Sequence, residues 1–274
     1  ARVGTVSGTS ISFGSETVFH SGQTYYSSAV YDSSNQKIVV AYADGSASYY
    51  GRAIVGTVSG TSISFGSEAT FESGTVYALG ITYDSTNGKI VIAYRDQGNS
   101  QYGTATVGTV DGSNNTISFG TPVVFSAGEG ANATIPVHDS TNNKIIISYR
   151  QTTNNNAGTV VVGTVSGTSI SFGSPVVFKS DRSDYVTSVF DPDSGNSIIV
   201  YQDYADSQYA EAIVFSTKTM GTNLTSENFI GISDASYTNG QTATIQLAGS
   251  VDDAQSGLTP GSKYYVQNDG TLST

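Results

Sequence analysis

The chain contains no cysteine and no tryptophan, and only 11 lysine and arginine residues face 22 aspartate and glutamate residues. Without cysteine, it cannot be a disulfide scaffold, a thiol enzyme or a cysteine-ligated zinc protein. The formal net charge of −11 excludes a basic nucleic-acid-binding protein. No apolar run approaches the roughly 20 residues that a membrane helix needs, so membrane insertion by a helix is not expected.

Repetition is what the sequence has in abundance. The string VGTV occurs at 3–6, 55–58, 107–110 and 162–165, and SFG follows at 12–14, 64–66, 118–120 and 171–173. An aspartate that opens a polar turn recurs at Asp32, Asp84, Asp139 and Asp191. A fixed period of 52 to 55 residues indicates a repeat architecture.

Each repeat predicts four short strands, here called A to D. In the second repeat they are 77–83, 89–94, 102–110 and 116–125. Glycine and β-branched residues dominate, and no window shows an apolar stripe at helical spacing. We therefore predict an all-β fold, a β-propeller of four-stranded blades with four to five blade slots. A β-solenoid is the alternative, although its coils are usually shorter, roughly 20 to 30 residues.

The repeats predict two parts of the chain. Residues 1–216 open with strands C and D, continue with three full repeats and end with a fourth A–B–C set. In residues 217–274 the pattern changes, although 229–233, 242–249 and 263–269 still predict strands. This segment either completes a fifth blade together with the N-terminal strands or forms a small separate module. Ring closure, which would remove free sheet edges, is slightly favoured, and a fragment of a longer ring is the third possibility.

Two stretches carry a resemblance to a known group of proteins. The string VGTVSGTSISFG, followed by YDSSNQKIVVAYAD, resembles repeats in virion and tail-fibre-like proteins of marine bacteriophages, including cyanophages. Residues 228–274 resemble a module that recurs in those proteins, and the A–B hairpin resembles sialidase-like and kelch-like propeller blades in outline. The resemblance implies a structural or host-recognition role, in a virion or outside the cell. It supplies no catalytic residues.

Positions that recur in every repeat are expected to serve the scaffold. The aspartates of the A–B turns predict Asx turns, with calcium ligands as the alternative; no other cofactor is expected. The tyrosines that end strand B predict packing between repeats, and they are Tyr42, Tyr94, Tyr149 and Tyr201. His138 occupies a slot that holds Tyr31, Tyr83 and Phe190 in the other repeats, which favours a packed, aromatic-like role over metal binding.

The variable D–A and B–C loops are expected on one face, and they predict the ligand site. They gather tyrosine with aspartate, asparagine, glutamine and arginine, a mixture that suits carbohydrate because rings cover sugar faces and planar polar groups bond neighbouring hydroxyls. An ordinary solvated loop face is the alternative. The candidate ligand-binding residues are Tyr25, Tyr26, Asp44, Tyr50, Tyr77, Arg95, Asp96, Tyr102, Asn132, Arg150, Asp184, Tyr185, Gln202, Asp203 and Tyr209.

From these patterns we predict a non-enzymatic, phage-like propeller that recognises a surface glycan or another host-surface receptor. Other virion proteins are further predicted partners, and neither catalytic nor metal-binding residues are expected. The alternatives are a structural spacer or assembly module of a virion, and a glycan-cleaving enzyme. A glycosidase would need two carboxylates within roughly 5–10 Å of each other, and the loop face offers Asp44, Asp96, Asp203, Glu72 and Glu129.

Overall fold

The computed structural model describes residues 1–217 and four residue pairs, 232–233, 245–246, 265–266 and 272–273. The chain divides into two compact units, Ala1–Thr217 and Lys218–Thr274. Among the described residues every element is a strand except the short 3₁₀ helix η1 (Gly45–Ala47), which confirms the predicted all-β class. None of the helices in the described part is long and apolar enough to cross a membrane.

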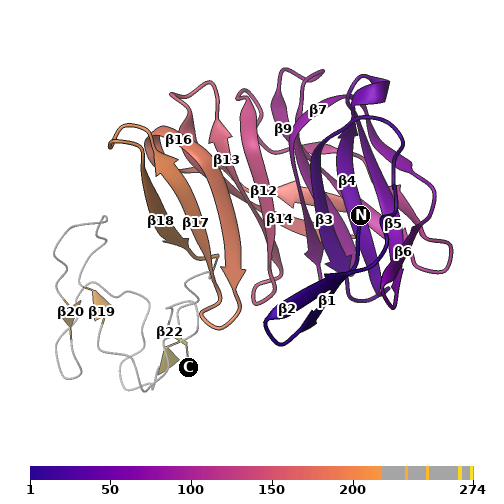
Figure 1. Ribbon diagram of the computed structural model, residues 1–274. Helices are drawn as coiled ribbons and strands as arrows, with labels where there is room; N and C mark the ends of the chain where they lie inside the picture. The colour runs from indigo at the N-terminus through magenta and orange to yellow at the C-terminus, as the bar shows by residue number, and fades with distance from the viewer. Residues whose placement is uncertain (218–231, 234–244, 247–264, 267–271, 274) are drawn as a thin grey trace. The chain divides into compact units, whose positions relative to one another are not determined.

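The first unit consists of four groups of three long antiparallel strands, preceded by a hairpin (Figure 1). The hairpin is β1 (Gly4–Ser7) and β2 (Ser10–Phe13). Group 1 is β3 (Thr24–Asp32), β4 (Lys37–Asp44) and β5 (Tyr50–Ser59), and group 2 is β7 (Ala69–Asp84), β8 (Lys89–Asp96) and β9 (Tyr102–Asp111). Group 3 is β12 (Ala131–Asp139), β13 (Lys144–Gln151) and β14 (Ala157–Ser166), and group 4 is β16 (Val176–Asp191), β17 (Asn196–Asp203) and β18 (Tyr209–Phe215).

Short strands pair with the third strand of groups 1 to 3: β6 (Ser62–Phe65), β10 (Thr116–Phe119), β11 (Val123–Val124) and β15 (Ser169–Phe172). In the second unit the described residues form two small pairs, β19 (Ile232–Ser233) with β20 (Ile245–Gln246) and β21 (Tyr265–Val266) with β22 (Leu272–Ser273). The described residues do not include the rest of the strands predicted at 229–233, 242–249 and 263–269. They also leave open the prediction that residues 217–274 take part in closing a ring.

Two strands belong to two groups at once. The first half of β7 pairs with β5 and its second half pairs with β8, and β16 joins β14 to β17 in the same way. The sequence predicted strands D and A as separate elements, whereas at these two junctions they form one strand of 16 residues. As a result, groups 1 and 2 share one sheet and groups 3 and 4 share another.

The second strand of each group is the centre of the core. In β8 and β13 the β-branched runs are buried, as expected for a strand covered on both faces. The predicted packing role of the recurrent tyrosines is confirmed, because all four are between 0% and 4% exposed. Each tyrosine meets a phenylalanine from the preceding repeat at 5.2 to 5.4 Å between ring centroids, in the pairs Phe19–Tyr42, Phe71–Tyr94, Phe125–Tyr149 and Phe178–Tyr201.

In groups 1 to 3, the glycine near the start of the third strand makes room for the phenylalanine of the next pair. A Cβ at Gly51 would overlap the ring of Phe71, and a Cβ at Gly103 would overlap the ring of Phe125. The glycine and the phenylalanine therefore form one packing unit, although they are about 20 residues apart in the sequence.

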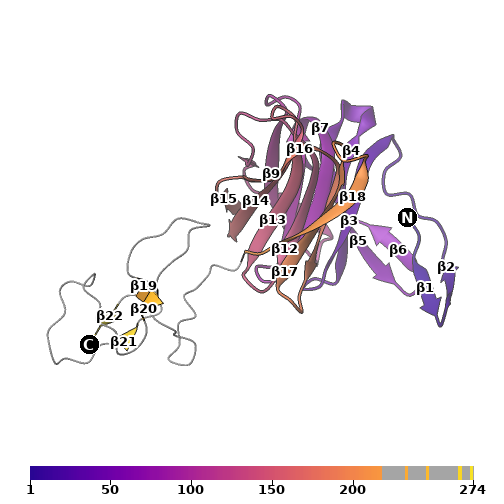
Figure 2. The same ribbon diagram turned by 90° about the vertical axis from the view of Figure 1, so that its left-hand side faces the viewer.

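The hairpin after each third strand packs on the preceding group when such a group exists. Ile117 and Ile170 are 5% and 3% exposed because they join the cores of the groups before them. In the N-terminal hairpin the corresponding Ile11 is 56% exposed and Phe13 is 60% exposed. Figures 1 and 2 show this hairpin projecting from the sheets, so the same residues are buried or exposed according to their place in the array.

Asx turns close the A–B hairpins, as predicted. One oxygen of Asp84 accepts the backbone N–H groups of Thr86 and Asn87, and the other accepts the side-chain amide of Asn87. Asp32 and Asp139 repeat this pattern. In the described part of the chain, no group of three or more histidine, cysteine, aspartate or glutamate side chains is placed to hold a metal.

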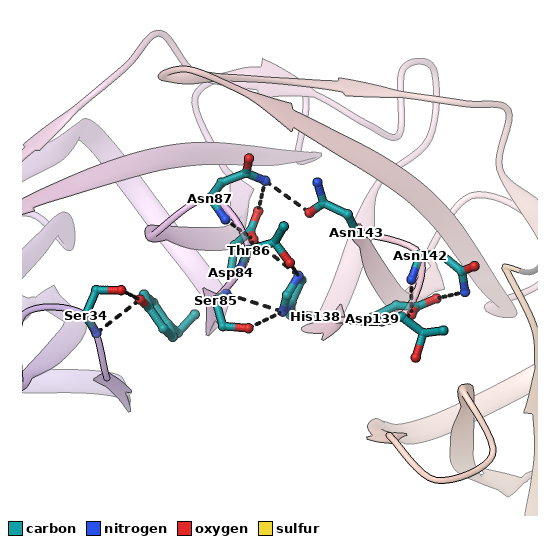
Figure 3. Close-up of polar contacts among 11 residues, drawn as sticks. Ser34, Asp84, Ser85, Thr86, Asn87, His138, Asp139, Asn142 and Asn143 are labelled. Atoms are coloured by element: carbon teal, nitrogen blue, oxygen red, sulfur yellow. Dashed lines mark hydrogen bonds and ion pairs between the residues drawn. The ribbon is translucent and has the colours of Figure 1, made fainter.

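Neighbouring groups are tied together at these turns (Figure 3). His138 of group 3 reaches the turn of group 2, where its Nε2 lies 3.2 Å from Asp84 Oδ1 and its Nδ1 lies 3.4 Å from the backbone nitrogen and Oγ of Ser85. Tyr83 of group 2 donates a hydrogen bond of 2.6 Å to Ser34 Oγ in the turn of group 1. In groups 2 and 3 this slot, which holds Tyr83 and His138, therefore contacts the preceding repeat.

We expect His138→Ala to lower the free energy of unfolding by about 2 kcal/mol, because it removes a ring that is 6% exposed and packs on the turn of the preceding group. Tyr31→Ala is the matched control, since Tyr31 occupies the same slot in the first group and is 53% exposed. It should cost less than about 1 kcal/mol. Urea unfolding followed by circular dichroism measures both, and equal losses would contradict the contact between groups.

Candidate functional site

The loops that precede strand A and those that follow strand B lie at one edge of the array, which we call the loop edge (the upper edge in Figure 1). Backbone hydrogen bonds link them: Val76 N donates to Tyr49 O at 2.9 Å and Gln97 N donates to Thr75 O at 3.0 Å. At the far end of the array, Tyr204 N donates to Arg182 O at 3.0 Å. The predicted placement of these loops on one face is thus seen in the structure.

A bulge shapes the start of the first strand in each group. The pairing register shifts between Tyr25 and Ser28, and again at the same place in the other three groups. Tyr26 and Tyr185 stand at this bulge with φ values of 52°. A left-handed backbone is uncommon for a bulky residue and costs about 1–3 kcal/mol. The surrounding ladder holds both tyrosines there, where they are 48% and 82% exposed.

An aromatic cluster occupies the loop edge of groups 1 and 2. Ring centroids lie 5.1 Å apart for Tyr25 and Tyr49, and 5.8 Å apart for Tyr49 and Tyr77 and for Tyr26 and Tyr77. The guanidinium of Arg95 lies 5.8 Å from the centre of the Tyr77 ring. Four of these five residues were predicted as ligand-binding residues, and the structure brings them together.

An arginine cavity lies at the loop edge of groups 3 and 4. It has a volume of about 290 Å³. Both oxygens of Asp184 are engaged: Arg150 Nη1 bonds to Oδ1, and Arg182 Nε and Nη2 lie 2.9 and 2.7 Å from Oδ2. Burial opposes ionisation, but the hydrogen bonds from Arg182 and Arg150 hold the pKa of Asp184 below its ordinary value. The lining residues are Asn132, Arg150, Arg182, Asp184 and Tyr185.

A carboxylate pair lies beside the aromatic cluster. Glu72 Oε1 accepts the N–H of Gly74 at 2.8 Å, and Glu72 Oε2 accepts the hydroxyl of Tyr94 at 3.2 Å. Asp96 Oδ1 accepts the N–H groups of Gly98 and Asn99. A Cβ built on Gly74 would stand 3.3 Å from Glu72 Oε1 and 3.9 Å from Asp96 Oδ1, so these oxygens are at most about 7 Å apart.

The environment of the carboxylate pair opposes the ionisation of Asp96. Partial burial, and then the charge of Glu72, raise the pKa of Asp96 above its ordinary value. Burial and the charge of Glu72 also raise the pKa of Tyr94, which keeps its hydroxyl available as a donor to Glu72. A carboxyl group whose pKa is raised beside a second carboxylate is a common arrangement for acid–base chemistry.

The remaining predicted residues lie outside these three clusters. Asp44 is 3% exposed and bonds to Arg52 Nε at 2.8 Å and to Ser46 N at 2.9 Å. Asp203 is 1% exposed and pairs with Lys179. The carboxylates of both are taken up by these partners. Gln202 stands opposite Asp184 in the ladder, while Tyr50, Tyr102 and Tyr209 begin β5, β9 and β18.

Three residues of these clusters were not candidates in the sequence analysis, namely Tyr49, Arg182 and Tyr94. Glu72 was named there only among the carboxylates of the loop face. Tyr49 precedes the predicted Tyr50, in the turn between the second and third strands of group 1. In this turn two successive residues, Ser48 and Tyr49, have positive φ values, and the same kind of turn recurs in the other groups. The recurrence of this turn was the feature of the sequence that could have pointed to Tyr49. Arg182 lies in β16, in a stretch that the sequence predicted as a D–A loop. The predicted D–A loops differ in length, so alignment of the repeats gave no guide to it. Tyr94 was assigned to packing alone, although its hydroxyl also reaches Glu72.

The chain matches no family model and no curated protein, so the resemblance to marine phage proteins stays a prediction. Among solved structures it is similar to an exo-β-1,3-galactanase from Phanerochaete chrysosporium with galactose, with a TM-score of 0.46 and 11% identity over 70% of this chain. Two variants of that enzyme with β-1,3-galactotriose match with TM-scores of 0.45 and 0.46 at 10% and 11% identity. The chain spans 45% of the length of these structures.

This comparison corrects the predicted function. The sequence predicted a non-enzymatic, phage-like receptor-binding protein, whereas the similar structures are those of glycan-cleaving enzymes. The activity in their names belongs to those proteins. The prediction that the chain is not an enzyme is withdrawn.

Proposed function

We propose that this chain is a carbohydrate-active protein that binds a glycan along the loop edge and hydrolyses it at Glu72 and Asp96. The observation that carries the proposal is the convergence of these two carboxylates, within about 7 Å, with the pKa of Asp96 raised. Glycosidases of both stereochemical classes use two carboxyl groups at roughly 5–9.5 Å. The alternative of a glycan-cleaving enzyme therefore has a pair of residues to test.

The surroundings of the two carboxylates assign their roles. Asp96, whose pKa is raised, donates its proton to the glycosidic oxygen as the bond to the anomeric carbon breaks. Glu72 is held at both oxygens by Gly74 N and the Tyr94 hydroxyl. It takes a proton from the water whose oxygen bonds to the anomeric carbon. The water molecule is consumed, and the two carboxyl groups exchange protonation states until solvent restores them.

The aromatic cluster supplies a platform for the sugar. Tyr77 pairs with Arg95 in the ladder, and the adjacent pair in register is Val76 with Asp96. Tyr77 and Arg95 of the aromatic cluster are thus neighbours in the ladder of the pair that contains Asp96. Exposed tyrosine rings cover the apolar faces of sugars and keep their hydroxyls available for hydrogen bonds.

We expect Asp96→Asn to lower the rate of glycan hydrolysis at least about a hundredfold, because the amide cannot donate the proton. Glu72→Gln should have a similar effect. The measurement is the release of reducing ends from a panel of neutral and acidic polysaccharides. Asp193→Asn is the matched control, since Asp193 is an exposed residue of an A–B turn.

The pH profile separates this role from a structural one. Activity should fall as the pH rises through the pKa of Asp96, and this limb should lie above the range of an ordinary aspartate, about 3.9. The limb should vanish in Asp96→Asn while circular dichroism shows an intact fold. Folded wild-type protein that releases no reducing ends from any polysaccharide of the panel would overturn the proposed activity.

We also propose that the four groups are blades of a β-propeller. Three observations support this arrangement. Each group has three antiparallel strands, and short strands or the start of β7 and β16 supply a fourth. Aromatic side chains pack between consecutive groups. A crystal structure that shows the groups around a common axis would establish it. A linear stack of coils would favour the solenoid instead.

A further inference from the structure

We propose that the arginine cavity binds the carboxylate of an acidic sugar residue, so that the glycan bound at the loop edge contains uronate units. This inference rests on the proposed function and names its substrate class. The site is the cavity of about 290 Å³ between groups 3 and 4, near the small end of the roughly 300–1,000 Å³ range of ligand pockets.

Charge is the first argument. Two guanidinium groups, Arg150 and Arg182, line the cavity with one carboxylate, Asp184, which leaves one positive charge in surplus among the lining side chains. The whole chain carries a net charge of −11, so a cationic pocket stands out against its surroundings. Arginine forks match the planar geometry of a carboxylate through paired hydrogen bonds.

Donor capacity is the second argument. A guanidinium has five N–H donors, and a carboxylate shared by two arginines cannot satisfy all ten. Arg150 uses Nη1 on Asp184, and its buried Nε has no hydrogen-bond partner. Arg182 directs Nε and Nη2 to Asp184 while its side chain remains 43% exposed. Asp184 therefore fixes both guanidinium groups in place and leaves an edge of Arg182 to the solvent.

The rest of the lining suits a sugar ring better than a bare anion. Tyr185 lines the cavity, is 82% exposed and has the left-handed backbone conformation at the bulge of β16, so its ring is accessible to a ligand bound beside the guanidinium groups. Arg182 also stacks over Tyr204, with its Cζ 4.2 Å from the ring centre, which limits its movement. A stacking surface next to a charged fork fits a pyranose that carries a carboxylate.

The test uses two probes that differ only at C6, methyl β-D-glucuronide and methyl β-D-glucoside, titrated into the full chain and followed by NMR. The glucuronide should bind about tenfold or more tightly than the glucoside, because charge-assisted hydrogen bonds are stronger than neutral ones. Arg182→Gln should remove this preference. Arg2→Gln, which removes the same charge from the N-terminal segment where Arg2 pairs with Glu16, should keep it.

Each outcome decides a different point. Equal affinity for the two probes, or equal competition by acetate, would overturn the acidic-sugar site and leave hydrolysis at Glu72 and Asp96 standing. Glucuronide preference without any hydrolysis would support the site and overturn the proposed activity. If Arg182→Gln fails to fold, Tyr185→Ala replaces it, and unchanged affinity for the glucuronide in that variant would also count against the site.

Discussion

Replacing Phe125 by alanine is expected to lower the free energy of unfolding by about 4 kcal/mol, in the range for removal of a buried phenylalanine. Phe125 is 4% exposed, and its ring lies 5.3 Å from Tyr149 and 5.6 Å from Phe172 between centroids. It rests on Gly103, which has no side chain to fill the space that would be left. The cavity would open between groups 2 and 3 and weaken both.

The control for this substitution is Phe13→Ala. Phe13 belongs to the recurrent SFG string but is 60% exposed in the N-terminal hairpin, so its loss should cost less than about 1 kcal/mol. Urea unfolding followed by far-ultraviolet circular dichroism suits both variants, because the chain has no tryptophan for fluorescence. A loss at Phe125 no larger than the loss at Phe13 would show that the aromatic pairs do not hold the groups together.

Replacing Gly120 by alanine is expected to destabilise the protein by about 3 kcal/mol through overpacking. A Cβ at Gly120 would overlap the backbone oxygen of Thr168 in the hairpin of the next group, and a backbone atom cannot move aside as a flexible side chain can. Gly66 meets Asn115 in the same way. This contact explains why glycine ends the SFG string in successive repeats.

Gly173 offers a control at the same position of the last SFG string. Its nearest neighbour to a built Cβ is Val162 O at 3.9 Å, an ordinary contact distance. Gly173→Ala should change the free energy of unfolding by no more than about 0.5 kcal/mol. Thermal and urea unfolding of the two variants would contradict this account if Gly173→Ala proved as costly as Gly120→Ala.

The repeats made much of the scaffold predictable from sequence. A recurring aspartate followed by serine, threonine and asparagine predicts a closed turn, because its hydrogen bonds are local. A run such as KIVIAY predicts a strand covered on both faces. The continuity of β7 and β16 was not predictable, because glycine and polar residues near the middle of each, such as Gly74 in β7, are typical of a loop.

The site was harder to predict because it depends on contacts between repeats. Asn132, Arg150, Asp184 and Tyr185 were selected one by one for their chemistry, and the structure gathers them around one cavity. Asp44 and Asp203 have the same position and residue type as Asp96, yet basic partners surround them. Glu72 gives Asp96 an acidic neighbour instead. The nearest charge decides the chemistry of each aspartate, and for Asp96 and Asp203 it comes from the preceding strand rather than from a neighbour in the sequence.

The strands that two groups share divide the array into pairs. Between groups 1 and 2, and between groups 3 and 4, the backbone ladder passes without a break through β7 or β16. Between groups 2 and 3 the two-residue β11 ends at Val124 and a loop leads to β12. The ladder therefore joins the four groups in two pairs, and between Val124 and Ala131 a single bridge, Tyr102 with Gly130, takes the place of a shared strand. Side-chain packing in the common core of groups 2 and 3 carries most of the connection between the two pairs.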